Sequence, residues 1–235
     1  MDNVISLNIP ESWSDINIGQ YQEFMQVEDD KTIESPRKKL VKQLSILCDY
    51  DESLINKLPA KSMAELIKAF DAFKQDPNSE FKPVIDVGGK KYGFQKDLHN
   101  LTLGEWIDLE HYVTTNPIDN LHKMIAVLYR PIITEGDEFF DYSIKTYEDI
   151  DALGNARLFR DNVNIQDVYG VVLFFLGIVK ESLIDMHSYF QLNSHQNKQM
   201  MIKAMQIVKK EIKKVKKKQT LSKKKGISKN GSGNI

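Results

Sequence analysis

Charge is divided unevenly along this chain, and the division separates a part that can fold as an acidic body from a basic end. Residues 196–235 contain thirteen lysines and one acid, Glu211, so they carry a charge of +12. The whole chain of 235 residues carries −1, which leaves −13 on residues 1–195. Opposite charges of this size favour an electrostatic partner for the basic end: a nucleic acid, an acidic protein surface or another copy of the body. We therefore predict an acidic body over residues 1–194, then a basic C-terminal helix and flexible tail over residues 195–235.

The composition is that of a folded protein from a reducing compartment. Apolar residues make up 41% of the chain, enough to bury a core. The single cysteine, Cys48, lies beside an apolar run and is expected to be a buried packing thiol. Residues 1–6 have no basic region before an apolar core, so we expect no signal peptide. The most apolar stretch, residues 168–179, is shorter than the roughly 20 residues that a membrane-spanning helix needs. It predicts a central buried helix, and the alternative is a peripheral membrane anchor.

Helix signals dominate the body and predict a mainly α-helical fold. Capping boxes begin at Asn17, Ser62 and Thr102, and Pro36 and Pro117 suit first helical turns. We expect helices over residues 18–26, 36–47, 62–73, 102–113, 117–129, 145–153, 164–188 and 195–217. A short helix capped by Asp51 and ending near residue 58, and a second short helix after residue 153, are also expected. Residues 84–94, with Gly88-Gly89 at their centre, predict one inserted β-hairpin. Residues 132–143 are predicted to be a loop.

Two stretches of the chain resemble each other at an offset of 85 residues. Residues 16–24 (INIGQYQEF) match residues 101–109 (LTLGEWIDL) in the order of their apolar, capping, glycine and aromatic positions. A proline-led helix with similar apolar spacing follows each. A true duplication would give two related helical units, 16–75 and 101–160, with the hairpin of residues 82–96 between them. The alternative is chance, because capping boxes and proline-led helices are common.

No pattern of residues points to catalysis. The five histidines form no i, i+4 pair of the kind that binds zinc on a helix, and the lone cysteine forms no ligand pair. Gly88-Gly89 lacks the residues that surround a phosphate-binding loop. We therefore predict that the protein is not an enzyme and has no catalytic residue, metal or cofactor.

Arg130 precedes Pro131 and is expected at the end of a helix. There it would interact favourably with the helix dipole. The alternative is that it pairs with an acid of residues 135–141 or with a partner.

The last predicted helix has an apolar seam surrounded by lysines. The seam residues recur at heptad spacing: Met201, Met205, Val208, Ile212 and Val215. So short a seam predicts docking on the body or on a neighbouring subunit rather than an independent coiled coil. The predicted electrostatic arm consists of Lys209, Lys210, Lys213, Lys214, Lys216, Lys217, Lys218, Lys223, Lys224 and Lys225. Lysines bind phosphates without reading bases, so DNA contact through the tail would be non-specific and salt-dependent. The alternative roles for the lysine-rich end are to keep the protein soluble or to contact an anionic membrane surface.

Four segments carry a family resemblance: IPESWSDINIGQYQEF (9–24), GKKYGF (89–94), LGEWIDLE (103–110) and HKMIAVLYRPI (122–132). Together they resemble virion-associated structural proteins of tailed bacteriophages, of the crAss-like podophage type. The resemblance covers residues 9–132 and leaves the basic tail outside. It implies a small structural protein of the particle, a ring or connector subunit between portal and tail, made in the host cytoplasm and located in the virion.

The leading prediction is therefore a virion structural protein. It would form a cyclic homo-oligomer, contact other virion proteins such as portal or tail subunits, and use its basic arm to reach a neighbour or DNA. The first alternative is a tail or neck assembly chaperone or scaffold that leaves before maturation. The second is a non-specific nucleic-acid-binding protein. No membrane partner is expected.

Overall fold

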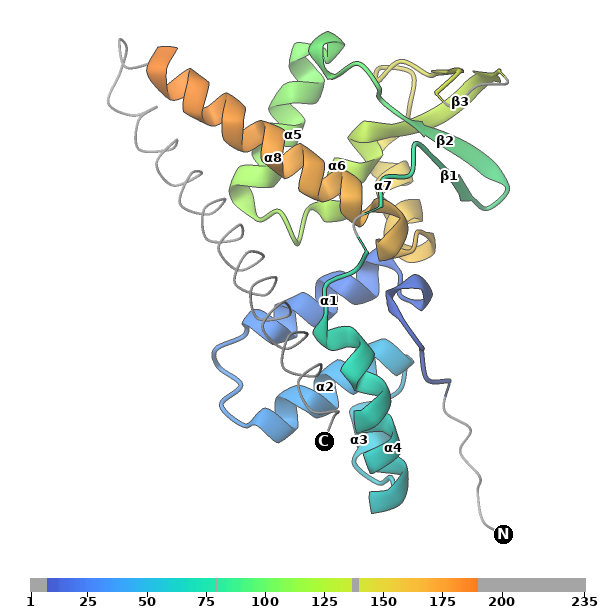
Figure 1. The fold of residues 1–235 in the computed structure, drawn as a ribbon, viewed down its shortest axis with the longest axis vertical. Coiled ribbons are helices and arrows are strands. Elements are labelled where there is room, and N and C mark those ends of the chain that lie inside the picture. The colour runs from blue at the N-terminus through green and yellow to red at the C-terminus, as the bar shows by residue number, and fades with distance from the viewer. Residues whose placement is uncertain (1–7, 79, 137–139, 190–235) are drawn as a thin grey trace, which may run out of the picture. The chain divides into compact units, whose positions relative to one another are not determined.

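The computed structural model describes residues 8–78, 80–136 and 140–189 (Figure 1). The chain divides into two compact units, Met1–Leu173 and Phe174–Ile235. The predicted helix over residues 195–217 and the basic tail lie outside the described residues. Within these, helices predominate and a small antiparallel sheet accompanies them, which confirms the helical fold class.

The first part of the chain forms four α-helices: α1 (Ile18–Asp29), α2 (Pro36–Cys48), α3 (Glu52–Ile55) and α4 (Ala60–Phe70). α1 begins at the predicted capping box, in which the Gln20 N–H donates to the Asn17 side chain over 2.8 Å and the Asn17 N–H donates back over 3.1 Å. α2 begins at Pro36 behind a Ser35 cap, also as predicted. The capping box predicted at Ser62 is wrong. α4 begins two residues earlier, because Pro59 fits the extended position before the first turn, and no side chain caps it.

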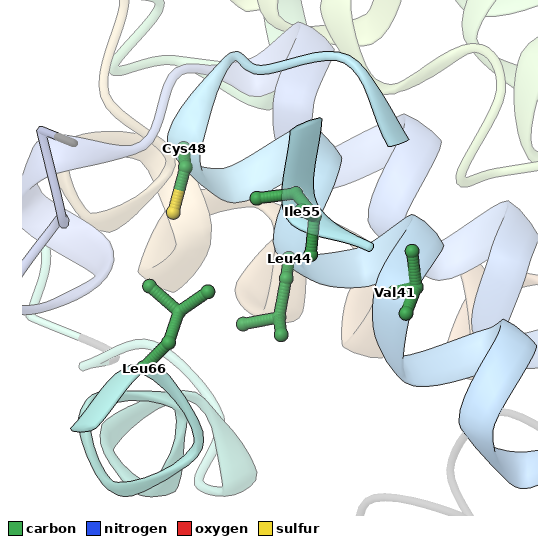
Figure 2. Close-up of a cluster of buried hydrophobic side chains, with 5 residues drawn as sticks. All are labelled: Val41, Leu44, Cys48, Ile55 and Leu66. Atoms are coloured by element: carbon green, nitrogen blue, oxygen red, sulfur yellow. The ribbon is translucent and has the colours of Figure 1, made fainter. Parts of the chain in front are cut away.

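A hydrophobic cluster joins α2, α3 and α4 (Figure 2). Its members come from three separate helices and point toward one another: Val41, Leu44, Cys48, Ile55 and Leu66. Each is at most 5% exposed, and burying one Val, Leu or Ile side chain stabilises a fold by roughly 1.5–3 kcal/mol. The cluster is therefore a local core, and the prediction that Cys48 is a buried packing residue is confirmed.

A four-stranded antiparallel sheet follows, in the order β1-β2-β3-β4. Its strands are β1 (Val84–Val87), β2 (Lys90–Phe94), β3 (Tyr129–Glu135) and β4 (Tyr142–Ile144), and the first three lie side by side in Figure 1. The predicted hairpin is confirmed: Gly88 and Gly89 have φ angles of 61° and 75°, the left-handed region that its turn requires.

The prediction of only one hairpin is wrong, because residues 129–144 contribute a second one. α6 (Leu121–Leu128) begins four residues later than predicted, because residues 117–120 form a turn, and it stops before Tyr129 instead of including it. Pro131 disfavours helical geometry at Arg130, and the β-branched residues that follow favour a strand. The segment predicted as a loop therefore contains most of β3 together with β4.

The remaining helices are α5 (Leu103–Thr115), α7 (Ala152–Asn162) and α8 (Ile165–Tyr189). The helix predicted over residues 145–153 is wrong, since the chain turns after β4 and α7 starts behind an Asp151 cap. α8 agrees with the predicted helix 164–188. Its residues Val168, Val171 and Val172 are buried, as expected for a core helix. No helix in the described part of the chain is long and apolar enough to cross a membrane.

α1 is attached to the junction between α7 and α8. The Ile18 N–H donates to the Val163 carbonyl and the Ile165 N–H donates to the Ile16 carbonyl, both over 2.9 Å. These two bonds flank an antiparallel bridge between Asn17 and Asn164. The start of α1 is thereby covered by an extended segment that lies about 145 residues away in sequence.

The second hairpin is attached to the first through Tyr142. Its ring lies over Gly93 of β2, and its hydroxyl lies 2.9 Å from the Phe94 carbonyl and 3.2 Å from the Pro83 carbonyl. A methyl group on Gly93 would come within 2.7 Å of Tyr142 Cδ2. The glycine is therefore required by close packing rather than by its backbone angle.

Candidate functional site

All residues predicted to form the electrostatic arm and its docking seam lie outside the described residues. The arm comprises Lys209, Lys210, Lys213, Lys214, Lys216, Lys217, Lys218, Lys223, Lys224 and Lys225, and the seam comprises Met201, Met205, Val208, Ile212 and Val215. Within residues 8–78, 80–136 and 140–189, the remaining candidate sites are the buried polar groups and the exposed apolar residues.

The best-buried charges of the described chain are Glu105 and Arg130. Their side chains are 2% and 5% exposed, and Arg130 Nη1 lies 3.1 Å from Glu105 Oε1. Glu105 also completes the capping box of α5, since its Oε2 accepts from the Thr102 N–H over 2.6 Å. Burial lowers the pKa of the Arg130 guanidinium, while Glu105 opposes that effect. The pair therefore fastens the start of α5 to β3.

This pairing corrects the prediction for Arg130. It lies in β3, opposite Gly93, and not at a helix end. Its partner is Glu105 rather than an acid of residues 135–141. The signal that could have revealed the pair is the capping box itself, because a Glu at that position has a second oxygen left to bind a cation.

A half-buried contact holds the turn before α7 against α5. The Tyr147 hydroxyl donates to Asp108 Oδ2 over 2.6 Å. Burial, followed by the Asp108 hydrogen bond and charge, raises the pKa of Tyr147. Burial followed by Asp108 also raises the pKa of Tyr112. Both phenols therefore stay protonated at neutral pH and act as structural groups, not as bases or nucleophiles.

Gln22 and His122 connect α1 with α6. Gln22 is 3% exposed, and its Nε2 lies 2.6 Å from the Ile118 carbonyl, 2.8 Å from the Asp119 carbonyl and 3.0 Å from His122 Nδ1. Burial, then the Lys123 and Arg160 charges, lower the pKa of His122 to about 4. The imidazole is therefore neutral at physiological pH and serves as a packing and hydrogen-bonding group.

Two further results concern metals and thiol chemistry. Among the residues that the structure describes, no group of three or more His, Cys, Asp or Glu side chains could hold a metal ion. Burial raises the pKa of the Cys48 thiol, which keeps it in its unreactive protonated form. The described polar contacts can fix the shape of the body, and none of them assembles a nucleophile beside a base.

The exposed apolar residues point to interaction surfaces instead. Large apolar side chains that remain accessible in the first unit are Ile67, Leu103, Ile107, Ile133 and Leu153. Leu103 and Ile107 are the two that share one helix face, because they lie four residues apart on α5. Leu103 is 75% exposed, the highest value of the set.

Comparisons with known proteins give no relatives. No family model, no curated protein and no solved structure matches the chain.

Proposed function

We propose that this protein is a structural subunit of a bacteriophage particle, a ring or connector component of the portal–tail region. The observation that carries the proposal is the charge split, −13 on residues 1–195 against +12 on residues 196–235. The resemblance of residues 9–132 to virion-associated structural proteins of tailed phages supports the same assignment.

The buried polar groups of the body favour an assembly role over chemistry. Glu105–Arg130 joins α5 to β3, Gln22–His122 joins α1 to α6, and Tyr147–Asp108 joins a turn to α5. Each of these contacts joins two elements of the same body, which is a structural role. Such an arrangement suits a protein that presents surfaces to partners.

The charge split suggests how copies would associate. The basic arm of one subunit would contact the acidic body of the next, in a head-to-tail arrangement that closes when the subunits form a ring. Complementary charge sets which surfaces meet and speeds their encounter, and salt screens it over a Debye length of about 8 Å at physiological ionic strength. The lysines would also be able to contact packaged DNA non-specifically.

The experiment that tests this function is quantitative mass spectrometry of purified particles of the phage that encodes the chain. The proposal predicts a fixed copy number per particle that is a simple ratio to the portal protein. Absence from mature particles but presence in precursor particles would instead identify an assembly chaperone or scaffold. Absence from both would contradict the proposal.

A further inference from the structure

Gln22 of α1 binds the start of α6 through its amide nitrogen. Its Nε2 lies 2.6 Å from the Ile118 carbonyl, 2.8 Å from the Asp119 carbonyl and 3.0 Å from His122 Nδ1. An amide nitrogen carries two hydrogens and accepts none. All three neighbouring atoms must therefore act as acceptors, which requires that His122 Nδ1 carries no proton.

The Gln22 amide cannot take the reverse orientation while the two helices stay in place. Exchanging its oxygen and nitrogen would put the oxygen 2.6 Å and 2.8 Å from two carbonyl oxygens. None of these three oxygens carries a hydrogen, so the contacts would be repulsive. The Ile118 and Asp119 carbonyls thus fix the direction of the amide, and His122 is the group that must fit it.

A charged imidazole does not fit the amide in this position. Both ring nitrogens of the charged form carry a hydrogen, so the hydrogen on Nδ1 would meet the hydrogens of Gln22 Nε2. Turning the ring by half a turn puts a carbon-bound hydrogen there, which is no acceptor either. The Gln22–His122 contact therefore exists only with the neutral ring.

Charged groups near this contact come from α6, α7, α1 and the turn before α6: Lys123, Arg160, Asp161, Glu23 and Asp119. Glu23 is bound to Arg160 over 2.7 Å, and the Asp119 carboxylate accepts from Gln26 over 2.7 Å. Burial, then the Lys123 and Arg160 charges, lower the pKa of His122, and Asp161 opposes them. The surroundings as a whole thus disfavour a proton on the ring.

We propose that Gln22 and His122 form a proton-sensitive contact between α1 and α6, which holds when the imidazole is neutral and breaks when the imidazole takes up a proton. The proton would bind at Nδ1, and the hydrogen bond from Gln22 Nε2 to that atom would be lost. The opening is local, because the start of α1 stays attached at its other side through the Asn17–Asn164 bridge. The inference depends neither on the basic arm nor on the proposed assembly role.

Hydrogen exchange of the full-length chain at pH 7 and pH 4, measured by mass spectrometry, tests the contact. Exchange times are scaled for the intrinsic effect of pH on amide exchange. Peptides from α1 and from the start of α6 are expected to exchange on the order of tenfold faster or more at pH 4, because the proton favours the open form, in which the histidine regains its ordinary pKa of about 6.5. Peptides from α2, α3 and α4 are expected to stay protected. Equal protection of α1 and α6 at both pH values, or loss of protection along the whole chain at once, overturns the proposal.

Two histidine variants show whether His122 is the group that takes up the proton. His122→Gln removes the titrating ring and keeps an acceptor for Gln22, so it is expected to abolish the faster exchange in acid. The matched control is His111→Gln, because His111 is exposed on α5 and its ring contacts Tyr112 instead. That control is expected to keep the full effect of acid. Faster exchange that persists in His122→Gln, or that disappears in both variants, overturns the proposal.

NMR of the His122 ring separates the role of the amide from that of burial. In the natural chain the ring is expected to titrate near pH 4, and the side-chain amide signals of Gln22 should change with the same midpoint. Gln22→Met removes the amide and keeps the length of the side chain, so the midpoint of His122 should move up. An unchanged midpoint in Gln22→Met, or Gln22 signals that do not follow the ring in the natural chain, overturns the proposal.

Discussion

Gly93→Ala is expected to destabilise the sheet because the ring of Tyr142 occupies the space of the added methyl group. That methyl would lie 2.7 Å from Tyr142 Cδ2, closer still to Cε2, and 3.0 Å from Ile144 Cγ2. Real Cβ atoms do not approach other atoms so closely, so the ring or strand β4 must move. The ring cannot move freely, since its hydroxyl is bound at the Phe94 and Pro83 carbonyls.

The free energy of unfolding should fall by about 1–3 kcal/mol. Overpacking costs roughly 1–3 kcal/mol and a displaced hydroxyl about 1 kcal/mol more, while the loss of glycine's freedom in the unfolded chain offsets about 0.4–1 kcal/mol. For a chain of this size each kcal/mol lowers Tm by about 2–4 °C. Urea and thermal unfolding, followed by the fluorescence of buried Trp13, measure the effect.

Two controls isolate the cause. Gly104→Ala adds the same methyl group where nothing lies within 4.0 Å except the Thr102 hydroxyl, and should leave stability unchanged or slightly raised. In a Tyr142→Ala background the ring is absent, so Gly93→Ala should cost much less than in the natural chain. A Gly93→Ala protein as stable as the natural one, or an equal cost in both backgrounds, would refute the close-packing explanation.

Three further predictions concern buried groups. Arg130→Met should lower the free energy of unfolding by roughly 3–5 kcal/mol, because Glu105 is left buried and unpaired. The double variant Arg130→Met with Glu105→Leu should recover much of that loss. Urea unfolding of the single and double variants measures both effects. The free energy of unfolding should fall by roughly 1–3 kcal/mol between pH 6.5 and pH 4. In that range the unfolded chain protonates His122, whereas the folded chain, in which the pKa of His122 is about 4, does not. His122→Gln should flatten that part of the plot of unfolding free energy against pH. The Cys48 thiol should react with a thiol reagent only after denaturation, and rapid reaction of the folded protein would contradict its burial.

Local signals in the sequence identified the elements whose ends are fixed by neighbouring residues. The capping boxes at Asn17 and Thr102 position α1 and α5, and Gly88-Gly89 closes the first hairpin. Each of these features depends on residues within a few positions of one another, which a single sequence contains in full.

Elements that depend on distant partners were not predicted. The strand β3 follows α6 without a break, so Tyr129 and Arg130 resembled the end of a helix in the sequence. Their strand geometry is stabilised by pairing with Phe94 and Gly93, about 35 residues earlier. Only the β-branched run Ile132–Thr134 signalled a strand, and the neighbouring acidic residues obscured it.

The candidate interaction face could be predicted only in part. The repeated pattern at residues 16–24 and 101–109 was visible in the sequence, but its two copies differ in what covers them. Burial of Ile18 depends on the distant segment 163–165, which no local pattern connects to α1. The charge split, in contrast, follows directly from the order of the charged residues along the chain.

The measurement that tests the assembly role most directly is the solution mass of the protein as a function of salt. Sedimentation equilibrium would compare the natural chain with a variant in which the ten arm lysines from Lys209 to Lys225 are changed to Gln, and with a control in which the same ten are changed to Arg. For the natural chain and the Arg control we predict a ring-sized species at low salt and a smaller species at high salt. For the Gln variant we predict no ring-sized species at any salt concentration. A natural chain that stays monomeric at every salt concentration, or a Gln variant that assembles equally well, would contradict the account.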